Sequence, residues 1–93
     1  MPNNFIINLS NRSQLDLKGL SKPVRNRIIR GLKQLETNPF PRGNTIRRIQ
    51  EMADILRLRV GDYRVIYQLT ENRVEIFRVI HRQELERALR TLF

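Results

Sequence analysis

Apolar residues in the first half of the chain recur at the spacing of an α-helix. The clearest stripe consists of Val24, Ile28, Leu32 and Leu35. A period of about 3.6 places these side chains on one face of a helix, which then packs against a core. Ser21 is a favoured cap residue, and Asn38 with Pro39 is a typical stop signal. We therefore predict a helix that begins near Ser21 and ends at Asn38.

Two shorter elements are predicted before this helix. Phe5 to Leu9 is an apolar run with the composition of a short strand. Ser10 or Asn11 then suits the cap of a helix that runs to about Lys18, and Gly19 suits its C-terminal end.

Beyond residue 44 the hydrophobic period changes from about 3.6 to about 2, which is typical of strands. The predicted strands are Thr45 to Ile49, Ile55 to Val60, Tyr63 to Thr70 and Val74 to His81. Helical spacing returns from Gln83 to Leu92. This order predicts an α+β fold in which an N-terminal strand and a two-helix hairpin pack on an antiparallel sheet, followed by a C-terminal helix. With 93 residues, the chain is expected to form one domain over residues 1–93.

Gly61 and Asp62 are predicted to form the two-residue loop of a tight hairpin, since glycine accepts positive φ. Arg59 then lies opposite Arg64, with Arg57 on the same face. The other face carries Leu56, Leu58, Val65 and Tyr67 toward the helices.

The next hairpin, with Glu71 and Asn72 as its loop, extends this register. It predicts Ile66 opposite Phe77 and Arg64 opposite Val79, and it places His81, the one histidine, on the face of the arginines. Arg82 follows where the strand ends, so it can turn onto the same side. The register also places Arg78 on the face covered by helices. Either Arg78 lies at an edge, or the register fails near it.

Charge indicates the kind of partner. The net charge is +9, and fifteen of the eighteen basic residues are arginine, since only three are lysine. Arginine matches phosphate with two parallel hydrogen bonds, so this composition favours a nucleic-acid partner. The alternative is a set of solvated arginines paired with Glu75, Asp54 or Glu84.

Other features narrow the class of protein. The chain has no cysteine, which excludes disulfides and thiolate zinc sites. Its apolar runs are too short to cross a membrane, and its first residues lack the pattern of a secretory signal, so we expect a cytoplasmic protein.

The hairpin segments resemble the RelE/ParE superfamily of toxins from toxin-antitoxin systems. "LRLRVGDYRVIY" and "FRVIHRQEL" correspond to that family's Leu-Arg strand, its Val-Gly-Asp-Tyr-Arg turn and its terminal His-Arg segment. "LKQLETNPFPRG" resembles the end of its long helix and the following loop. The resemblance covers Gly31 to Leu85.

In the RelE branch, the resemblance implies a ribosome-dependent endoribonuclease that cleaves messenger RNA by attack of the 2′-OH, with no metal or other cofactor. Arg57, Arg64 and Arg82 match basic positions of the family, and Arg59 would join them in binding phosphate. The sequence departs from the pattern at Ile55, at Ile80 and in having no tyrosine after Arg82. His81 is therefore our candidate for proton transfer, with Glu84 and Glu86 as weaker ones.

The resemblance leaves two other functions open. A ParE-like toxin would inhibit DNA gyrase without cleaving RNA, and a catalytically silent relative would only bind RNA. Both toxin interpretations imply a cognate antitoxin. It is expected to cover the basic face with an acidic or amphipathic segment, or to replace the contacts of the Gln83 to Leu92 helix. Tyr63, beside the turn, is a core residue or a stacking platform for a base.

Overall fold

The computed structural model describes residues 4–49, 52 and 54–92, which form a five-stranded sheet and three α-helices. The strands are β1 (Ile6–Leu9), β2 (Ile46–Arg48), β3 (Ile55–Val60), β4 (Tyr63–Leu69) and β5 (Arg73–His81). The helices are α1 (Asn11–Lys18), α2 (Lys22–Leu35), the short 3₁₀ helix η1 (Arg82–Glu84) and α3 (Leu85–Leu92). Every predicted element is present, with ends that differ by a few residues.

The sheet has the order β1-β5-β4-β3-β2. Strands β2 to β5 form the predicted antiparallel meander, and β1 joins β5 in parallel. The sheet is therefore mixed.

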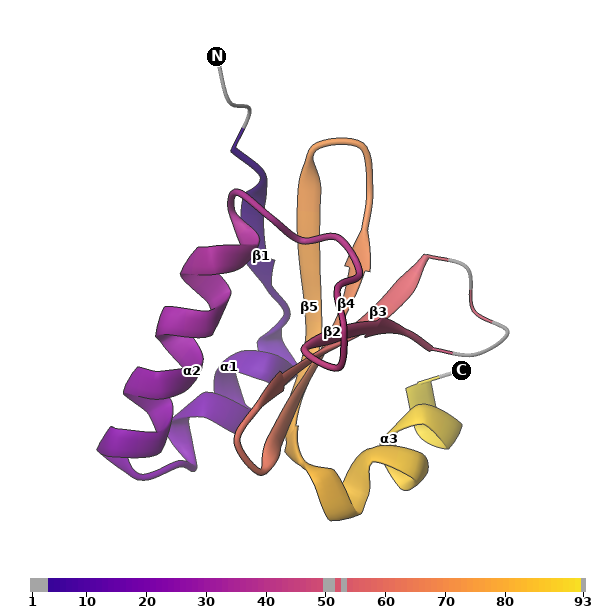
Figure 1. Ribbon diagram of the computed structural model, residues 1–93. Helices are drawn as coiled ribbons and strands as arrows, with labels where there is room; N and C mark the ends of the chain where they lie inside the picture. The colour runs from indigo at the N-terminus through magenta and orange to yellow at the C-terminus, as the bar shows by residue number, and fades with distance from the viewer. Residues whose placement is uncertain (1–3, 50–51, 53, 93) are drawn as a thin grey trace.

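Helices cover both sides of this sheet. Figure 1 shows α1 and α2 on one side and α3 on the other. The larger core lies under α1 and α2, and its buried side chains include Ile28, Leu32, Leu35, Leu56, Leu58, Val65 and Tyr67. The smaller core lies under α3 and contains Ile49, Ile55, Ile66, Ile80 and Ala88. The predicted apolar faces of α2 and of the β3–β4 hairpin are confirmed.

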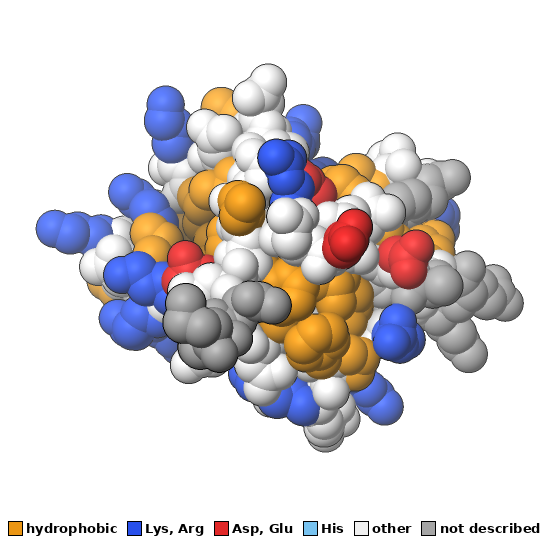
Figure 2. Space-filling model, turned by 90° about the horizontal axis from the view of Figure 1, so that it is seen from above, with side chains coloured by type: hydrophobic (Ala, Val, Ile, Leu, Met, Phe, Trp, Pro, Cys, Tyr) orange, Lys and Arg blue, Asp and Glu red, His pale blue; other side chains and the backbone are white. Residues whose placement is uncertain are grey.

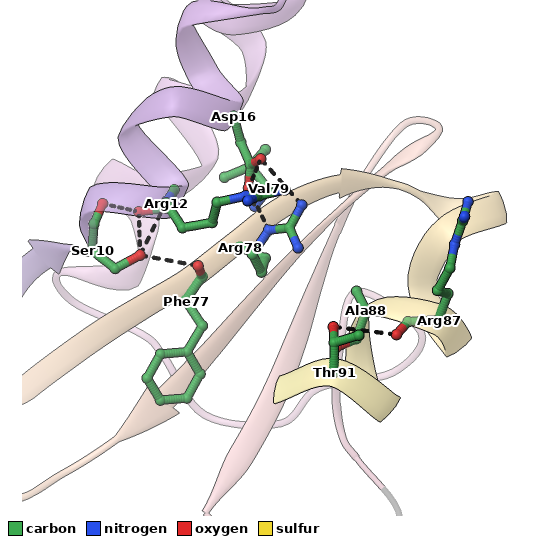
Figure 3. A network of polar contacts seen from close by, with 10 residues as sticks. Ser10, Arg12, Asp16, Phe77, Arg78, Val79, Arg87, Ala88 and Thr91 are labelled. Atoms are coloured by element: carbon green, nitrogen blue, oxygen red, sulfur yellow. Dashed lines mark hydrogen bonds and ion pairs between the residues drawn. The ribbon is translucent and has the colours of Figure 1, made fainter. Parts of the chain in front are cut away.

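Polar contacts join α1 to β5 where β1 ends. Strand β1 pairs with β5 only as far as Ile76, so the rest of that edge needs other partners. Asp16 accepts a hydrogen bond from the Val79 backbone N–H (2.9 Å) and two from the Arg78 guanidinium (2.8 and 3.2 Å), as Figure 3 shows. Ser10 caps α1 by accepting from Ser13 N and donates to Phe77 O. Side chains of α1 and of its cap residue Ser10 thus take the place of a neighbouring strand along this part of β5.

The predicted register of the second hairpin is wrong beyond Tyr67. Tyr67 pairs with Ile76 as expected, but Ile66 pairs with Arg78, because a bulge at Phe77 adds one residue to β5. Arg64 therefore lies opposite Ile80. A one-residue shift exchanges the two faces of a strand.

The bulge has a clear physical reason. Without it, Arg78 would point into the larger core, whereas the shift places Val79 there and Ile80 in the smaller core. Arg78 instead leaves the sheet on the side of Ile66 and reaches Asp16 at the edge. The same shift moves His81 to the α1 and α2 side, opposite Tyr63. The prediction that His81 shares a face with the arginines is therefore wrong.

None of the helices in the described part of the chain has the length and apolar character that a membrane span requires.

The Asp16–Arg78 pair is expected to contribute strongly to stability, since both side chains are largely buried (12% and 15% exposed). Replacing Asp16 by Ala leaves the guanidinium and the Val79 N–H without their acceptor. We predict that Asp16→Ala lowers the free energy of unfolding, measured by denaturant titration, by about 3 kcal/mol. Arg12, 66% exposed and 3.8 Å from the same carboxylate, provides the control, and Arg12→Ala should cost less than about 0.5 kcal/mol. Equal losses would contradict this assignment.

Candidate functional site

The β3–β4 hairpin closes through the predicted Gly61–Asp62 turn. Gly61 has φ of +58°, a conformation that L side chains rarely adopt. The register matches the prediction at every pair from Val60–Tyr63 to Arg57–Ile66. Arg59 and Arg64 therefore lie directly opposite each other, on the side of the sheet that faces away from α1 and α2.

A further arginine extends this surface. In β2, Arg47 pairs with Arg57 and so lies on the same side. We call Arg47, Arg57, Arg59 and Arg64 the arginine face. Arg47 was not predicted from the sequence, because β2 is short and local patterns do not give its pairing with β3. The order Ile46, Arg47, Arg48 offers two candidate arginines, and only the register of β2 identifies which one joins the others.

The arginine face is electrostatically unfavourable for the free protein. Burial, followed by repulsion from Arg47 and Arg59, lowers the pKa of Arg57. Burial also lowers the pKa of Arg64, with further repulsion from Arg57, Arg59 and Arg82. Guanidinium groups nevertheless remain protonated in proteins, so the repulsion persists.

The described carboxylates do not form ion pairs with these guanidinium groups, and Asp62 only partly offsets the repulsion at Arg64. Within the described residues, no member of the arginine face forms an ion pair. Of the proposed partners, Glu75 lies 3.7 Å from Arg73, and Glu84 lies 3.9 Å from Arg87. Solvated pairing with these groups therefore does not explain the cluster.

Two arginines are anchored at the turn itself. The Arg64 guanidinium donates through one nitrogen, Nη1, to the backbone oxygens of Gly61 and Tyr63 (2.9 Å each). The Arg82 backbone N–H donates to Asp62 O (2.8 Å), and its Nε lies 3.7 Å from the Asp62 carboxylate. These contacts hold both side chains at one end of the arginine face. The remaining guanidinium nitrogens of Arg64 can donate to an anion.

His81 lies in a different environment. Its ring meets Tyr63 edge to face, with centroids 5.5 Å apart, and Nδ1 accepts a hydrogen bond from Gln83 N (3.2 Å) as the cap of η1. His81, Tyr63 and Glu84 all line an open depression of about 340 Å³ beside α1. The structure thus brings Arg57, Arg59, Arg64 and Arg82 together and separates His81 from them.

Metal-binding side chains are not grouped in the part of the chain that the structure describes: it holds no cluster of three or more His, Cys, Asp or Glu residues placed to bind an ion.

Fold and arginine face together define a class, a small basic α+β protein built on a strand, a helix pair and an antiparallel meander. A family model described as the ParE toxin of the type II toxin-antitoxin system parDE matches residues 7–86. A relative in Methanocaldococcus jannaschii, named "Putative toxin RelE1", is 32% identical over 82 residues, which are 86% of this chain and 91% of that protein. The chain therefore belongs to the RelE/ParE superfamily of toxins from type II toxin-antitoxin systems.

Solved structures share this fold. RelE in the archaeal RelE–RelB complex from Pyrococcus horikoshii OT3 has a TM-score of 0.74 and 25% identity, and the match covers 85% of this chain and 96% of that one. A mutant of the E. coli toxin RelE in the free state, with two arginines replaced by alanine, has a TM-score of 0.74 and 18% identity over 97% and 99% of the two chains.

Removing one charge from the arginine face is expected to stabilise the free protein. Like charges directly opposite in a sheet destabilise it by about 0.2–1 kcal/mol. Arg59→Gln should therefore raise the thermal unfolding midpoint at low ionic strength, and the gain should shrink in about 0.5 M salt because screening shortens the reach of the repulsion. Arg73→Gln is the control, because it removes the same charge from an arginine that lies 3.7 Å from the Glu75 carboxylate and not opposite another arginine. If both variants shift the midpoint equally, the arginine face carries no special repulsion.

Proposed function

We propose that this toxin is a ribosome-dependent endoribonuclease that cleaves messenger RNA and so inhibits translation. The observation that carries the proposal is the direct opposition of Arg59 and Arg64, with Arg57 beside them. None of the three forms an ion pair with a described carboxylate. The arrangement is unfavourable in the free protein, and a bound phosphate would convert the mutual repulsion into shared attraction.

The reaction requires the RNA itself as nucleophile. The 2′-oxygen attacks the adjacent phosphorus, the bond from phosphorus to the 5′-oxygen breaks, and the products are a 2′,3′-cyclic phosphate and a 5′-OH. The 2′-OH loses a proton and the departing oxygen gains one. Arg64 and Arg82, held at the turn, would stabilise the charge that develops on the phosphate oxygens, while Arg57 and Arg59 bind the backbone.

Proton transfer is assigned to His81, with Glu84 and Glu86 as weaker candidates. The separation of His81 from the arginine face supports a mechanism in which charge stabilisation and positioning supply most of the acceleration. Nδ1 of His81 is occupied as a helix cap, so Nε2 is the nitrogen left for proton transfer. His81→Ala should therefore reduce cleavage less than Arg64→Ala.

A cognate antitoxin is the proposed protein partner. RelE of P. horikoshii was solved in complex with RelB. Two surfaces of this chain suit such a partner: the arginine face, which would attract an acidic segment, and the smaller core, where α3 buries only Ala88 fully among its described residues. An amphipathic segment of an antitoxin would cover the first or replace α3 on the second.

Inhibition of DNA gyrase is the second candidate function. Two observations favour it: the matching family model describes a ParE toxin, and His81 lies away from the arginine face. Gyrase binding requires no proton-transfer residue. A relative that binds RNA without cleaving it would likewise require no proton-transfer residue beside the arginine face.

Mapping messenger RNA 5′ ends by primer extension in a translating extract tests the proposal. Wild type should produce cuts at codon-phased positions. Arg64→Ala should reduce them by about 10²-fold or more, because a preorganised donor to the transition state is lost. His81→Ala should give a smaller loss.

The matched control is Arg73→Ala, which removes the same charge at the opposite end of β4 and β5 from the turn and should cut like wild type. Intact message with wild-type protein that still arrests growth would overturn the nuclease proposal. Inhibition of DNA supercoiling by that protein would then identify the gyrase function.

A further inference from the structure

The exposed side of α2 has a charge pattern that helix stability does not explain. Its fourteen residues, KPVRNRIIRGLKQL, contain five cations and no acidic residue. Like charges three residues apart destabilise a helix. This spacing occurs in three pairs of α2: Lys22–Arg25, Arg27–Arg30 and Arg30–Lys33. Lys22 also lies at the positive end of the helix dipole, where a cation is unfavourable. A negatively charged ligand would compensate for both the repulsion between the cations and the unfavourable position of Lys22.

Most of these cations are free to meet a ligand. Lys22, Arg27, Arg30 and Lys33 are exposed, and within the described residues none of them forms an ion pair. Arg25 differs, because its guanidinium donates to Leu20 O (2.9 Å) and supports the loop before the helix. Figure 2 shows blue Lys and Arg side chains projecting on the left of the molecule, the side on which α2 lies in Figure 1.

Arg27 connects this surface to the arginine face. Its guanidinium lies over the turn, so close to Gly61 that a Cβ added there would be 3.1 Å from Nη2. Arg64 donates to Gly61 O, and Arg82 is bound to Asp62. Cations thus continue from α2, across the turn, to the opposite side of the sheet.

The residue types on the exposed side of α2 indicate which class of ligand it binds. Protein interfaces usually contain apolar or aromatic anchors and few charges at their centre, whereas the exposed side of α2 contributes only Ile29 as a large apolar residue. Single-stranded RNA is typically held by stacking on aromatic side chains, and α2 contains no aromatic residue. Cations without stacking residues fit the phosphate backbone of a base-paired RNA.

We propose that the exposed cations of α2, Lys22, Arg27, Arg30 and Lys33, bind the backbone of a folded, double-helical RNA, while the arginine face holds the scissile strand. The inference rests on the proposed action on RNA and adds a second contact. Docking through α2 would position the toxin on a structured RNA and leave the arginine face open to a single strand.

The test measures binding without cleavage. Fluorescence anisotropy would follow a labelled 20-base-pair RNA duplex and a 12-nucleotide single strand across a salt series. The variant Arg30→Gln/Lys33→Gln removes two exposed cations and keeps good helix formers. The control Arg73→Gln/Arg90→Gln removes two exposed arginines from β5 and α3, so the net charge is equal. Circular dichroism would verify that all three proteins are folded.

We expect the α2 variant to bind the duplex about tenfold more weakly at 0.1 M salt, with the slope of log K against log salt smaller by about 2, one for each lost phosphate contact. The control should stay near wild type, and binding of the single strand should change less. Equal losses in the variant and the control, or duplex binding by the α2 variant that equals wild type, would overturn the inference.

Because no ribosome or cleavage enters this assay, its outcome is independent of the primer-extension experiment. A toxin that cuts message but shows no α2-dependent duplex binding would retain the proposed function and lose this inference. A toxin that binds duplex RNA through α2 but cuts no message would do the reverse.

Discussion

The repulsion between Arg59 and Arg64 is the constraint on which the rest of the site depends. The Gly61–Asp62 turn fixes the register of β3 and β4, and that register leaves no freedom in which residues face each other. Since Leu58 and Val65 must enter the larger core, the arginines between and beside them must emerge on the other side. Burial of the apolar residues therefore holds the like charges together. The cost is moderate at a surface, and it is the feature that makes this side of the sheet receptive to phosphate.

The two cores divide the sheet so that this side stays partly open. Helices α1 and α2 cover one side completely enough to bury Tyr67 and Val65, whereas α3 covers only the part of the other side around Ile66 and Ile80. The arginine face occupies the remainder, near the turn. The bulge at Phe77 allows this division, because it directs Val79 and Ile80 into different cores and sends Arg78 to Asp16 at the edge. The registers of the two hairpins thus determine both which side chains enter each core and which arginines stay exposed.

Local patterns were sufficient to predict the order of elements, the β3–β4 register and the cluster of Arg57, Arg59 and Arg64, because periodicity and the Gly-Asp turn are short-range signals. Two features required the tertiary structure. A bulge adds one residue without a distinctive local sequence, so the side occupied by His81 depended on how Arg78 and Val79 compete for the core. The contribution of Arg47 depended on pairing between an edge strand and β3. The awkward position predicted for Arg78 did mark the place where the register changes.

The most direct test of a phosphate-binding arginine face is the coupling between Arg59 and Arg64, measured with and without RNA. A double-mutant cycle with Arg59→Gln and Arg64→Gln would compare free energies of unfolding at low salt, first for the free protein and then with a saturating 2′-O-methyl RNA oligonucleotide, which lacks the attacking hydroxyl. A phosphate-binding arginine face requires a repulsive coupling in the free protein that falls toward zero or becomes attractive with RNA bound. A coupling that is the same in both conditions would contradict it.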